Sequence, residues 1–96
     1  MTSPFSSLLG MQGQKFSIER NDKIVATSKG LSNREKFGRK YIGFMPGTDI
    51  VTEDWLINSS SERFYVEDTE TSYYHGRPHQ LKAYYLTDVE YKTKMQ

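Results

Sequence analysis

Residues that favour β-strands are spread along the whole chain, and alanine is almost absent. Val, Ile, Thr, Phe, Tyr and Trp account for 30 of the 96 residues, whereas alanine, the strongest helix former, occurs only at Ala26 and Ala83. This composition favours a sheet over a helical bundle. A chain of this length makes about one small domain, because domains of roughly 100–150 residues are the commonest size. We therefore expect one all-β domain over residues 1–96.

Apolar and polar residues alternate in short segments that turn-forming residues separate. Phe16 and Ile18 alternate with polar neighbours, which places the apolar side chains on one face of a strand. The same reasoning predicts strands near residues 14–19, 23–27, 40–45, 55–57, 63–68 and 81–86, with a short segment from Asp49 and a polar corner at residues 52–54 before the fourth of them. About six short strands predict a small antiparallel β-barrel or sandwich. We favour the closed barrel because closure removes unprotected strand edges.

We predict different structures for the two ends of the chain. Residues 1–13 predict a short N-terminal helix or arm, with Ser3 as the N-cap, Pro4 as the first helical residue and Gly10 at the end. A helix this short needs to dock on the domain to be stable. Residues 87–96 are polar and predict a trailing tail.

Residues 28–39 predict a long, mobile, basic loop. They include four basic residues but only two large apolar ones, Leu31 and Phe37. A loop of this length is uncommon in so short a chain unless it has a function. The candidate contact residues for a channel or a partner in and beside this loop are Lys29, Arg34, Lys36, Arg39 and Lys40.

The formal net charge is +1, but opposite charges occupy separate parts of the chain. Residues 14–40 contain eight basic and three acidic residues, whereas residues 46–70 contain seven acidic residues and one basic residue. The low net charge excludes a polycation whose sign alone drives binding to nucleic acid or membrane. Three interpretations stay open: two solvated faces, a basic edge of one copy that meets an acidic edge of the next, or a basic loop that approaches nucleic acid.

The sequence contains no motif for catalysis. It has no cysteine, no glycine-rich phosphate loop and no spacing of carboxylates that singles out an acid–base pair. His75 and His79 are four residues apart, but Gly76 and Pro78 prevent the helix that would bring both imidazoles to one metal. We therefore predict no catalytic, metal or cofactor site, and expect a protein that is not an enzyme.

Cysteine usage and the first residues also bear on the compartment. A small secreted scaffold usually needs disulfides, and this chain has no cysteine. The first ten residues have neither a basic region nor a sustained apolar stretch, so we predict no signal peptide and no membrane association. The expected compartment is the cytoplasm.

We expect some aromatic residues in the core and the others at the surface, according to how much volume the aliphatic residues leave unfilled. Leucine and isoleucine are too few to fill a barrel, so Phe16, Phe44, Trp55 and Phe64 are expected in the core. Most tyrosines are then left for the surface, where tyrosine is typical of protein interfaces. The candidate interface residues are Glu53, Glu67, Asp68, Tyr73, Tyr74 and Tyr84.

Residues 41–57, followed by a short turn and residues 63–68, resemble the small head–tail connector proteins of tailed bacteriophages, also called head-closure or head–tail adaptor proteins. The shared pattern is an apolar strand, a turn with Asp-Ile, a polar corner that ends in Asp before an apolar triplet, and a strand with an aromatic residue and Val on one face. The positions are Ile42, Phe44, Asp49, Ile50, Asp54, Leu56, Phe64 and Val66. Gly76 and the strand at 81–86 extend the likeness, with Asp49, Asp54 and Gly76 as structural turn residues.

The resemblance implies a structural virion protein. Such subunits form a ring of many copies between the portal of a filled capsid and the tail, and help to retain DNA. Family members often have a long loop between early strands, and residues 28–39 would be that loop here. The implied partners are other copies of the chain, portal or adaptor proteins, tail proteins and packaged DNA. The implied location is the virion, with the host cytoplasm before assembly.

An alternative that the residues leave open is an OB-like barrel that binds single-stranded nucleic acid. Such barrels combine a basic groove with aromatic side chains on which bases stack. Here the basic stretch at 14–40 would supply the charge, with Tyr41 and Tyr84 as the stacking residues.

Overall fold

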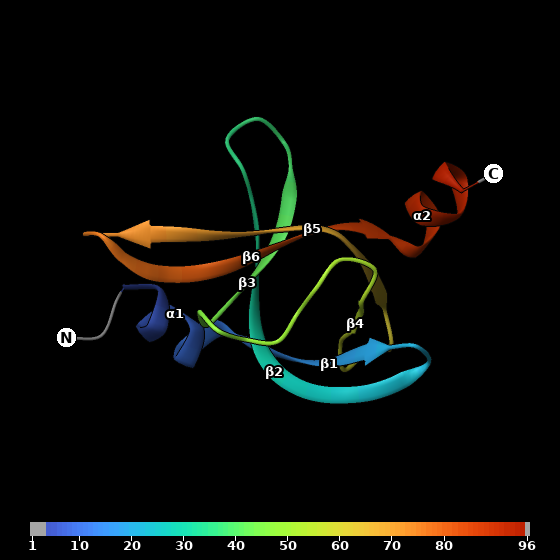
Figure 1. The fold of residues 1–96 in the computed structure, drawn as a ribbon, viewed down its shortest axis with the longest axis horizontal. Helices are drawn as coiled ribbons and strands as arrows, with labels where there is room; N and C mark the ends of the chain where they lie inside the picture. The colour runs from blue at the N-terminus through green and yellow to red at the C-terminus, as the bar shows by residue number, and fades with distance from the viewer. Residues whose placement is uncertain (1–3, 96) are drawn as a thin grey trace.

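Residues 4–95 are the part of the chain that the structure, a computed structural model, describes, and there they form six strands and two short helices (Figure 1). The strands are β1 (Gln14–Arg20), β2 (Lys23–Arg34), β3 (Lys40–Phe44), β4 (Trp55–Ile57), β5 (Arg63–Tyr74) and β6 (Arg77–Thr87); the helices are α1 (Pro4–Gln12) and α2 (Asp88–Lys94). All strand pairs are antiparallel, in the order β1-β2-β3-β6-β5-β4, and β4 pairs with β1. The prediction of a closed antiparallel β-barrel is confirmed.

Alternate apolar residues of the strands fill the barrel. Phe16 of β1 packs edge-on against Phe44 of β3, with aromatic-ring centroids 5.8 Å apart. Phe64 of β5 also packs edge-on against Phe16, with ring centroids 6.2 Å apart. The buried core cluster consists of Phe16, Ile18, Ile42, Phe44, Ile50, Leu56, Val66, Leu81 and Ala83. These residues place the core between the paired strands, as their alternation predicts.

Helix α1 docks on the barrel through Phe5 and Leu9, which are both buried. The aromatic ring of Phe5 packs edge-on against His79 of β6, at a centroid distance of 5.6 Å. A Cβ atom at Gly43 of β3 would lie 3.0 Å from the Phe5 ring and would overlap the Gln80 side chain. Glycine at position 43 therefore permits the close approach of the helix to the barrel.

The end of α1 differs from the prediction. The helix continues through Gly10 to Gln12, and the amide of Gly13 donates to the Leu9 carbonyl at 2.8 Å. The end predicted at Gly10 is therefore wrong, and the predicted N-cap, Ser3, lies outside the described residues. Across residues 4–95, neither helix has the length and apolar character needed to cross a membrane.

Residues 28–39 depart most from the prediction. β2 continues through Arg34, so the predicted loop is wrong for residues 28–34 and only residues 35–39 connect the strands. Arg34 pairs with Lys40, and Leu31 pairs with Gly43, which makes a regular hairpin of β2 and β3. Figure 1 shows this hairpin projecting from the barrel, and we call residues 32–40 the arm. A two-stranded projection has few apolar residues for the same reason that a loop has few, because solvent surrounds both.

Helix α2 takes the place of the polar tail predicted for residues 87–96. Its first turn is a capping box: the Thr87 hydroxyl accepts from the Glu90 amide at 3.2 Å, and the Glu90 carboxylate accepts from the Thr87 amide at 2.9 Å. The bond from the Thr87 amide lowers the pKa of Glu90. Tyr91 packs against Trp55, with centroids 4.9 Å apart. Trp55 was predicted in the core but is only half-buried, with Tyr91 against it.

Candidate functional site

The arm, which projects from the barrel, is the candidate surface for contact with a partner. Its turn is closed by two backbone hydrogen bonds, from the Glu35 amide to the Arg39 carbonyl at 2.7 Å and from the Gly38 amide to the Glu35 carbonyl at 3.0 Å. Gly38 has a φ of 100°, which glycine adopts without a steric penalty. The turn is therefore a defined structure and not an open loop.

One side of the arm is held to β6 by Glu35. Its carboxylate accepts a hydrogen bond from the Tyr84 hydroxyl at 2.6 Å and one from the Lys82 ammonium at 3.0 Å. The bonds from Tyr84 and Lys82 lower the pKa of Glu35. Burial and the bond to Glu35 raise the pKa of Tyr84 above its ordinary value. Glu70 also lies 3.2 Å from the Tyr84 hydroxyl, which has one proton and donates it over the shorter distance, to Glu35.

The other side of the arm is held to β5 by Arg39. The guanidinium lies over the aromatic ring of Tyr84, 3.8 Å from its centroid. It donates to Asp68 at 3.3 Å and lies 3.9 Å from Glu67. Planar stacking together with ion pairing is a contact that arginine makes better than lysine. Glu35 and Arg39 thus connect both ends of the turn to the barrel wall.

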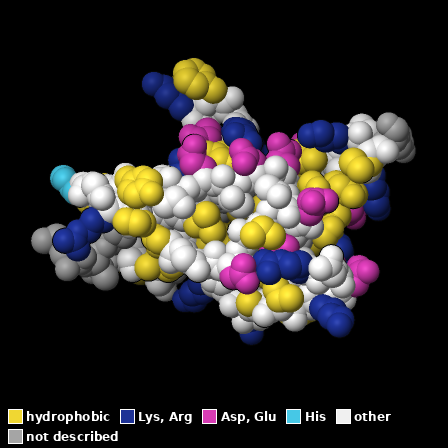
Figure 2. Space-filling view, viewed as in Figure 1, with side chains coloured by type: hydrophobic (Ala, Val, Ile, Leu, Met, Phe, Trp, Pro, Cys, Tyr) yellow, Lys and Arg dark blue, Asp and Glu magenta, His cyan; other side chains and the backbone are white. Residues whose placement is uncertain are grey.

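The tip of the arm, Lys36 and Phe37, is free of these contacts. The Phe37 side chain is 94% exposed, and the Lys36 ammonium lies 5.9 Å from its ring centroid. Figure 2 shows a basic and a hydrophobic side chain at the outer end of the projection, with acidic side chains gathered at its base. Within residues 4–95, neither Lys36 nor Arg34 forms an ion pair.

The five predicted basic contact residues therefore separate into two groups. Arg39 is engaged at the base of the arm, and Lys40 pairs with Glu90 of α2 at 3.0 Å. Lys29 makes a long contact, 3.4 Å, with the Gly10 carbonyl. Arg34 and Lys36 carry the charge that the arm presents to solvent. The structure brings four of the predicted residues onto the arm, and two of these, Arg39 and Lys40, are paired within the subunit. Lys29 lies outside the arm, where β2 pairs with β1.

The separated charges of the sequence largely meet inside the subunit. Arg20 pairs with Asp49 and Asp54, and Arg39 pairs with Glu67 and Asp68, which joins the basic segment to the acidic one. The predicted interface residues Glu67 and Asp68 therefore already have a cation beside them. Antiparallel pairing thus brings two cations of the basic segment, Arg20 and Arg39, against four carboxylates of the acidic one.

The predicted interface tyrosines also divide. Tyr73 and Tyr74 are 66% and 47% exposed at the end of β5, beside a two-residue turn in which His75 and Gly76 both have positive φ. This confirms the turn predicted at Gly76. Tyr84 is buried at 4% exposure, so its prediction as a surface residue is wrong. The arm covers the outer face of β6 at that position.

The remaining predicted positions lie near the corner before β4. Glu53 is exposed and has a φ of 76°, and its amide donates to the Val66 carbonyl at 2.8 Å. Asp54 is buried and accepts from the Val51 amide at 3.0 Å, as predicted for a residue that caps a turn. Asp49 is exposed and contacts Arg20 instead.

No group of side chains in the described residues is arranged to hold a metal ion. His75 and His79 are separated by the turn and the start of β6, and His79 packs between Phe5 and Tyr74. The Nδ1 atom of His79 is buried without a hydrogen-bond partner in the part of the chain that is described. His79 therefore packs beneath α1, against Phe5.

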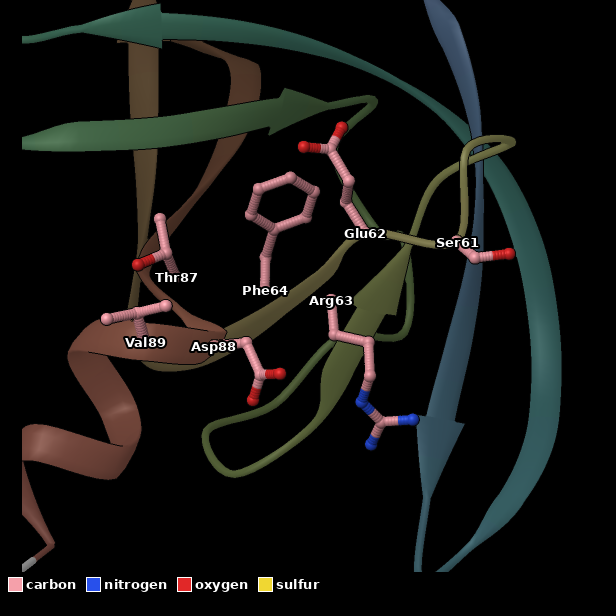
Figure 3. A pocket seen from close by; sticks show the side chains of 7 residues that line it. All are labelled: Ser61, Glu62, Arg63, Phe64, Thr87, Asp88 and Val89. Carbon is pink, nitrogen blue, oxygen red and sulfur yellow. The ribbon is translucent and has the colours of Figure 1, made fainter.

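A small pocket lies between the start of β5 and the start of α2 (Figure 3). Its volume is about 270 Å³, and Phe64 and Val89 contribute apolar surface while Glu62 and Asp88 contribute carboxylates. Sequence reasoning missed this pocket, because it depends on α2, which was predicted as a tail. The capping-box pattern from Thr87 to Glu90 is the signal that would have indicated it.

The chain matches no protein-family model, no curated protein and no solved structure.

Proposed function

We propose that this chain is a structural virion protein, a head–tail connector or head-closure subunit of a tailed bacteriophage. Copies would form a ring between the portal and the tail and would help to retain packaged DNA. The proposal starts from the resemblance of residues 41–86, which form β3, the corner before β4, β4, β5 and β6. The protein would reside in the virion, and in the host cytoplasm before assembly.

The observation that carries this proposal is the exposed tip of an anchored arm. Exposure of one large apolar side chain is ordinary, but Phe37 stands at the outer end of a hairpin whose turn is held to the barrel at both ends by Glu35 and Arg39. The exposed Phe37 side chain adds almost no packing to its own barrel. A contact with another subunit or with the next component of a connector gives it a role.

Binding of single-stranded nucleic acid is less well supported. That function needs aromatic faces open to bases. Tyr41 and Tyr84, the two residues expected to stack, are 6% and 4% exposed and pack on each other with centroids 5.8 Å apart. The basic arm still offers Arg34 and Lys36 to phosphates, which fits contact with DNA by charge alone.

Measurement of the assembly state tests the proposal. Native mass spectrometry of the purified chain, alone and with the portal protein from the same genome, is expected to show a ring of subunits in at least one condition. A chain that stays monomeric and does not bind portal protein would contradict the proposal. Lys36→Glu is expected to impair assembly. Lys23→Glu, at an exposed basic residue that begins β2 beside the turn of the β1–β2 hairpin, is the matched control.

A salt titration of oligonucleotide binding distinguishes the nucleic-acid-binding alternative from the connector proposal. Affinity for an oligonucleotide that falls steeply with salt, in a chain that forms no ring, would favour the nucleic-acid-binding barrel. No binding at low salt would eliminate that alternative.

A further inference from the structure

We propose that the arm tip, Lys36 and Phe37, inserts into the pocket between β5 and α2 of a second copy of this chain. This inference rests on the proposed function, because it names the contact that would join neighbours in the ring. The occupant is a second copy, and the argument uses the chemistry of the tip and of the pocket.

The size of the pocket suits a side chain. Its volume, about 270 Å³, lies below the roughly 300–1,000 Å³ of pockets for small molecules. In Figure 3, the Phe64 ring stands between the carboxylates of Glu62 and Asp88, with Thr87 and Val89 on the side of α2. Arg63 also lines the pocket, but its guanidinium pairs with Glu19 at 2.8 Å and lies over the Trp55 ring, so it forms no ion pair with Glu62 or Asp88. An apolar centre flanked by two carboxylates fits an apolar group that has a cation next to it.

The unpaired charges on the two surfaces are opposite. The Glu62 carboxylate accepts a hydrogen bond from the side-chain amide (Nδ2) of Asn58 at 2.8 Å, but no cation lies within ion-pair distance of it among the residues described. Within residues 4–95, the cation beside Asp88 is the exposed Lys92, with its ammonium 3.5 Å from the Asp88 carboxylate. Lys36 likewise has no carboxylate partner in residues 4–95. Insertion would bring Lys36 to the acidic rim of the neighbour.

The apolar surfaces are also complementary. Phe37 is 94% exposed and Val89 is 73% exposed, while Phe64 is partly buried beneath the pocket. Contact between them removes apolar area from water on both sides. An aromatic anchor in a pocket is the usual form of an interface hot spot.

The geometry of the contact is head-to-tail. None of the residues that line the pocket belongs to the arm, so the tip and the pocket are different surfaces of one subunit. Each copy then offers one tip and one pocket. A contact between unlike surfaces repeats from copy to copy and closes into a ring when the rotation allows.

Cysteine pairing tests the contact directly, because the chain has no cysteine of its own. Lys36→Cys and Glu62→Cys are made in separate chains that differ in mass through a tag, then mixed under mild oxidation, so that the disulfide replaces the ion pair while Phe37, Phe64 and Val89 stay in place. A disulfide-linked dimer that contains one chain of each kind is expected. The control mixes Lys36→Cys with Val25→Cys, which is exposed on β2 outside the pocket, and is expected to give no such dimer above background.

The outcomes separate this inference from the proposed function. A ring without the linked dimer overturns the tip-to-pocket contact and leaves the connector proposal standing. A linked dimer from a chain that forms no ring and does not bind portal protein supports the contact and overturns the connector proposal. A chain with neither a ring nor the linked dimer overturns both.

Exchanging the charges of Lys36 and Glu62 tests the ion pair proposed between the tip and the pocket. Lys36→Glu is expected to weaken self-association about tenfold, as sedimentation velocity would measure it. Combining Lys36→Glu with Glu62→Lys is expected to recover most of that loss, because the pair is restored with reversed signs. Failure to recover, with both variants folded by circular dichroism, overturns the pairing of Lys36 with Glu62.

Discussion

Arg20 donates two hydrogen bonds to the buried carboxylate of Asp54, from Nε to Oδ1 and from Nη2 to Oδ2, each at 2.9 Å. Asp54 is 1% exposed and also accepts from the Val51 amide. The same guanidinium reaches the exposed Asp49 at 3.2 Å. This bidentate pair ties the end of β1 to the corner that precedes β4, where the barrel closes.

Removal of the buried partner of Arg20 should therefore destabilise the barrel. Asp54→Ala is expected to lower the free energy of unfolding by about 3 kcal/mol, because a buried pair and a backbone hydrogen bond are both lost. Asp49→Ala removes a carboxylate from the same arginine, but at the surface, and is expected to cost less than about 1 kcal/mol. Urea unfolding of both variants measures the difference. Equal costs would contradict this account of the corner.

Two glycines should respond in opposite directions to alanine. A Cβ atom at Gly30 would lie 2.6 Å from the Ile42 side chain and 2.7 Å from the Phe44 ring, inside the packed core. Gly30→Ala is expected to destabilise the protein by about 1–3 kcal/mol through overpacking. Gly10 lies in α1 with no described atom within 4 Å of its Cβ position, so Gly10→Ala should add about 0.5–1 kcal/mol of stability. Melting temperatures that move in the same direction would refute this reading of the core.

The capping box of α2 should be measurable through Trp55, the only tryptophan in the chain. Thr87→Ala removes the hydroxyl that accepts from the Glu90 amide and is expected to cost about 1 kcal/mol. Because Tyr91 packs on Trp55, loosening of α2 should shift the tryptophan emission to longer wavelength at temperatures below the main transition. Thr93→Ala, in the same helix but away from the cap, is the control and should leave the emission unchanged.

The contact at the base of the arm should depend on pH through Glu35. Its pKa is lower in the folded protein than the ordinary 4.5, chiefly because of the bond from Tyr84 and then that from Lys82. A lowered pKa gives stability that is fully present above the unfolded value and is lost as the pH falls through the folded value. The wild type should therefore be more stable than Glu35→Gln at pH 7, and the difference should shrink as the pH drops below about 4.5. Melting curves between pH 7 and pH 3 test this, and a difference that grows towards acid pH would contradict it.

The barrel could be predicted from the sequence because its signals are local. The alternation around Phe16 and Ile18, the turn at residues 20–22 and the turn at Gly76 each depend on neighbouring residues. Closure of the barrel followed from the need to protect strand edges, whereas the strands that close it, β1 and β4, could be identified only from the structure. The start of α2 was also local, in the pattern from Thr87 to Glu90, but the polar composition of that segment obscured it.

The base of the arm could not be predicted in this way. Glu35 is 49 residues from Tyr84 and 47 from Lys82 in the chain, so their contact exists only once β2, β3 and β6 are paired. Tyr84 is adjacent to the half-buried Tyr85, and alternation alone placed it at the surface. The arm folds over that face of β6, which buries a residue that the strand pattern would expose. Long-range pairing, and not residue preference, decides the environment at this position.

The two anchors of the arm have a kinetic consequence. Glu35 and Arg39 fix the hairpin against β6 and β5 within the single subunit, so the neighbour that we propose would meet a tip that is already shaped. Docking then costs little conformational entropy, because the tip is already ordered. The association rate is therefore set by diffusion and by electrostatic attraction. Raising the ionic strength would screen Lys36 and slow that collision, and would leave the lifetime of the docked state comparatively unaffected.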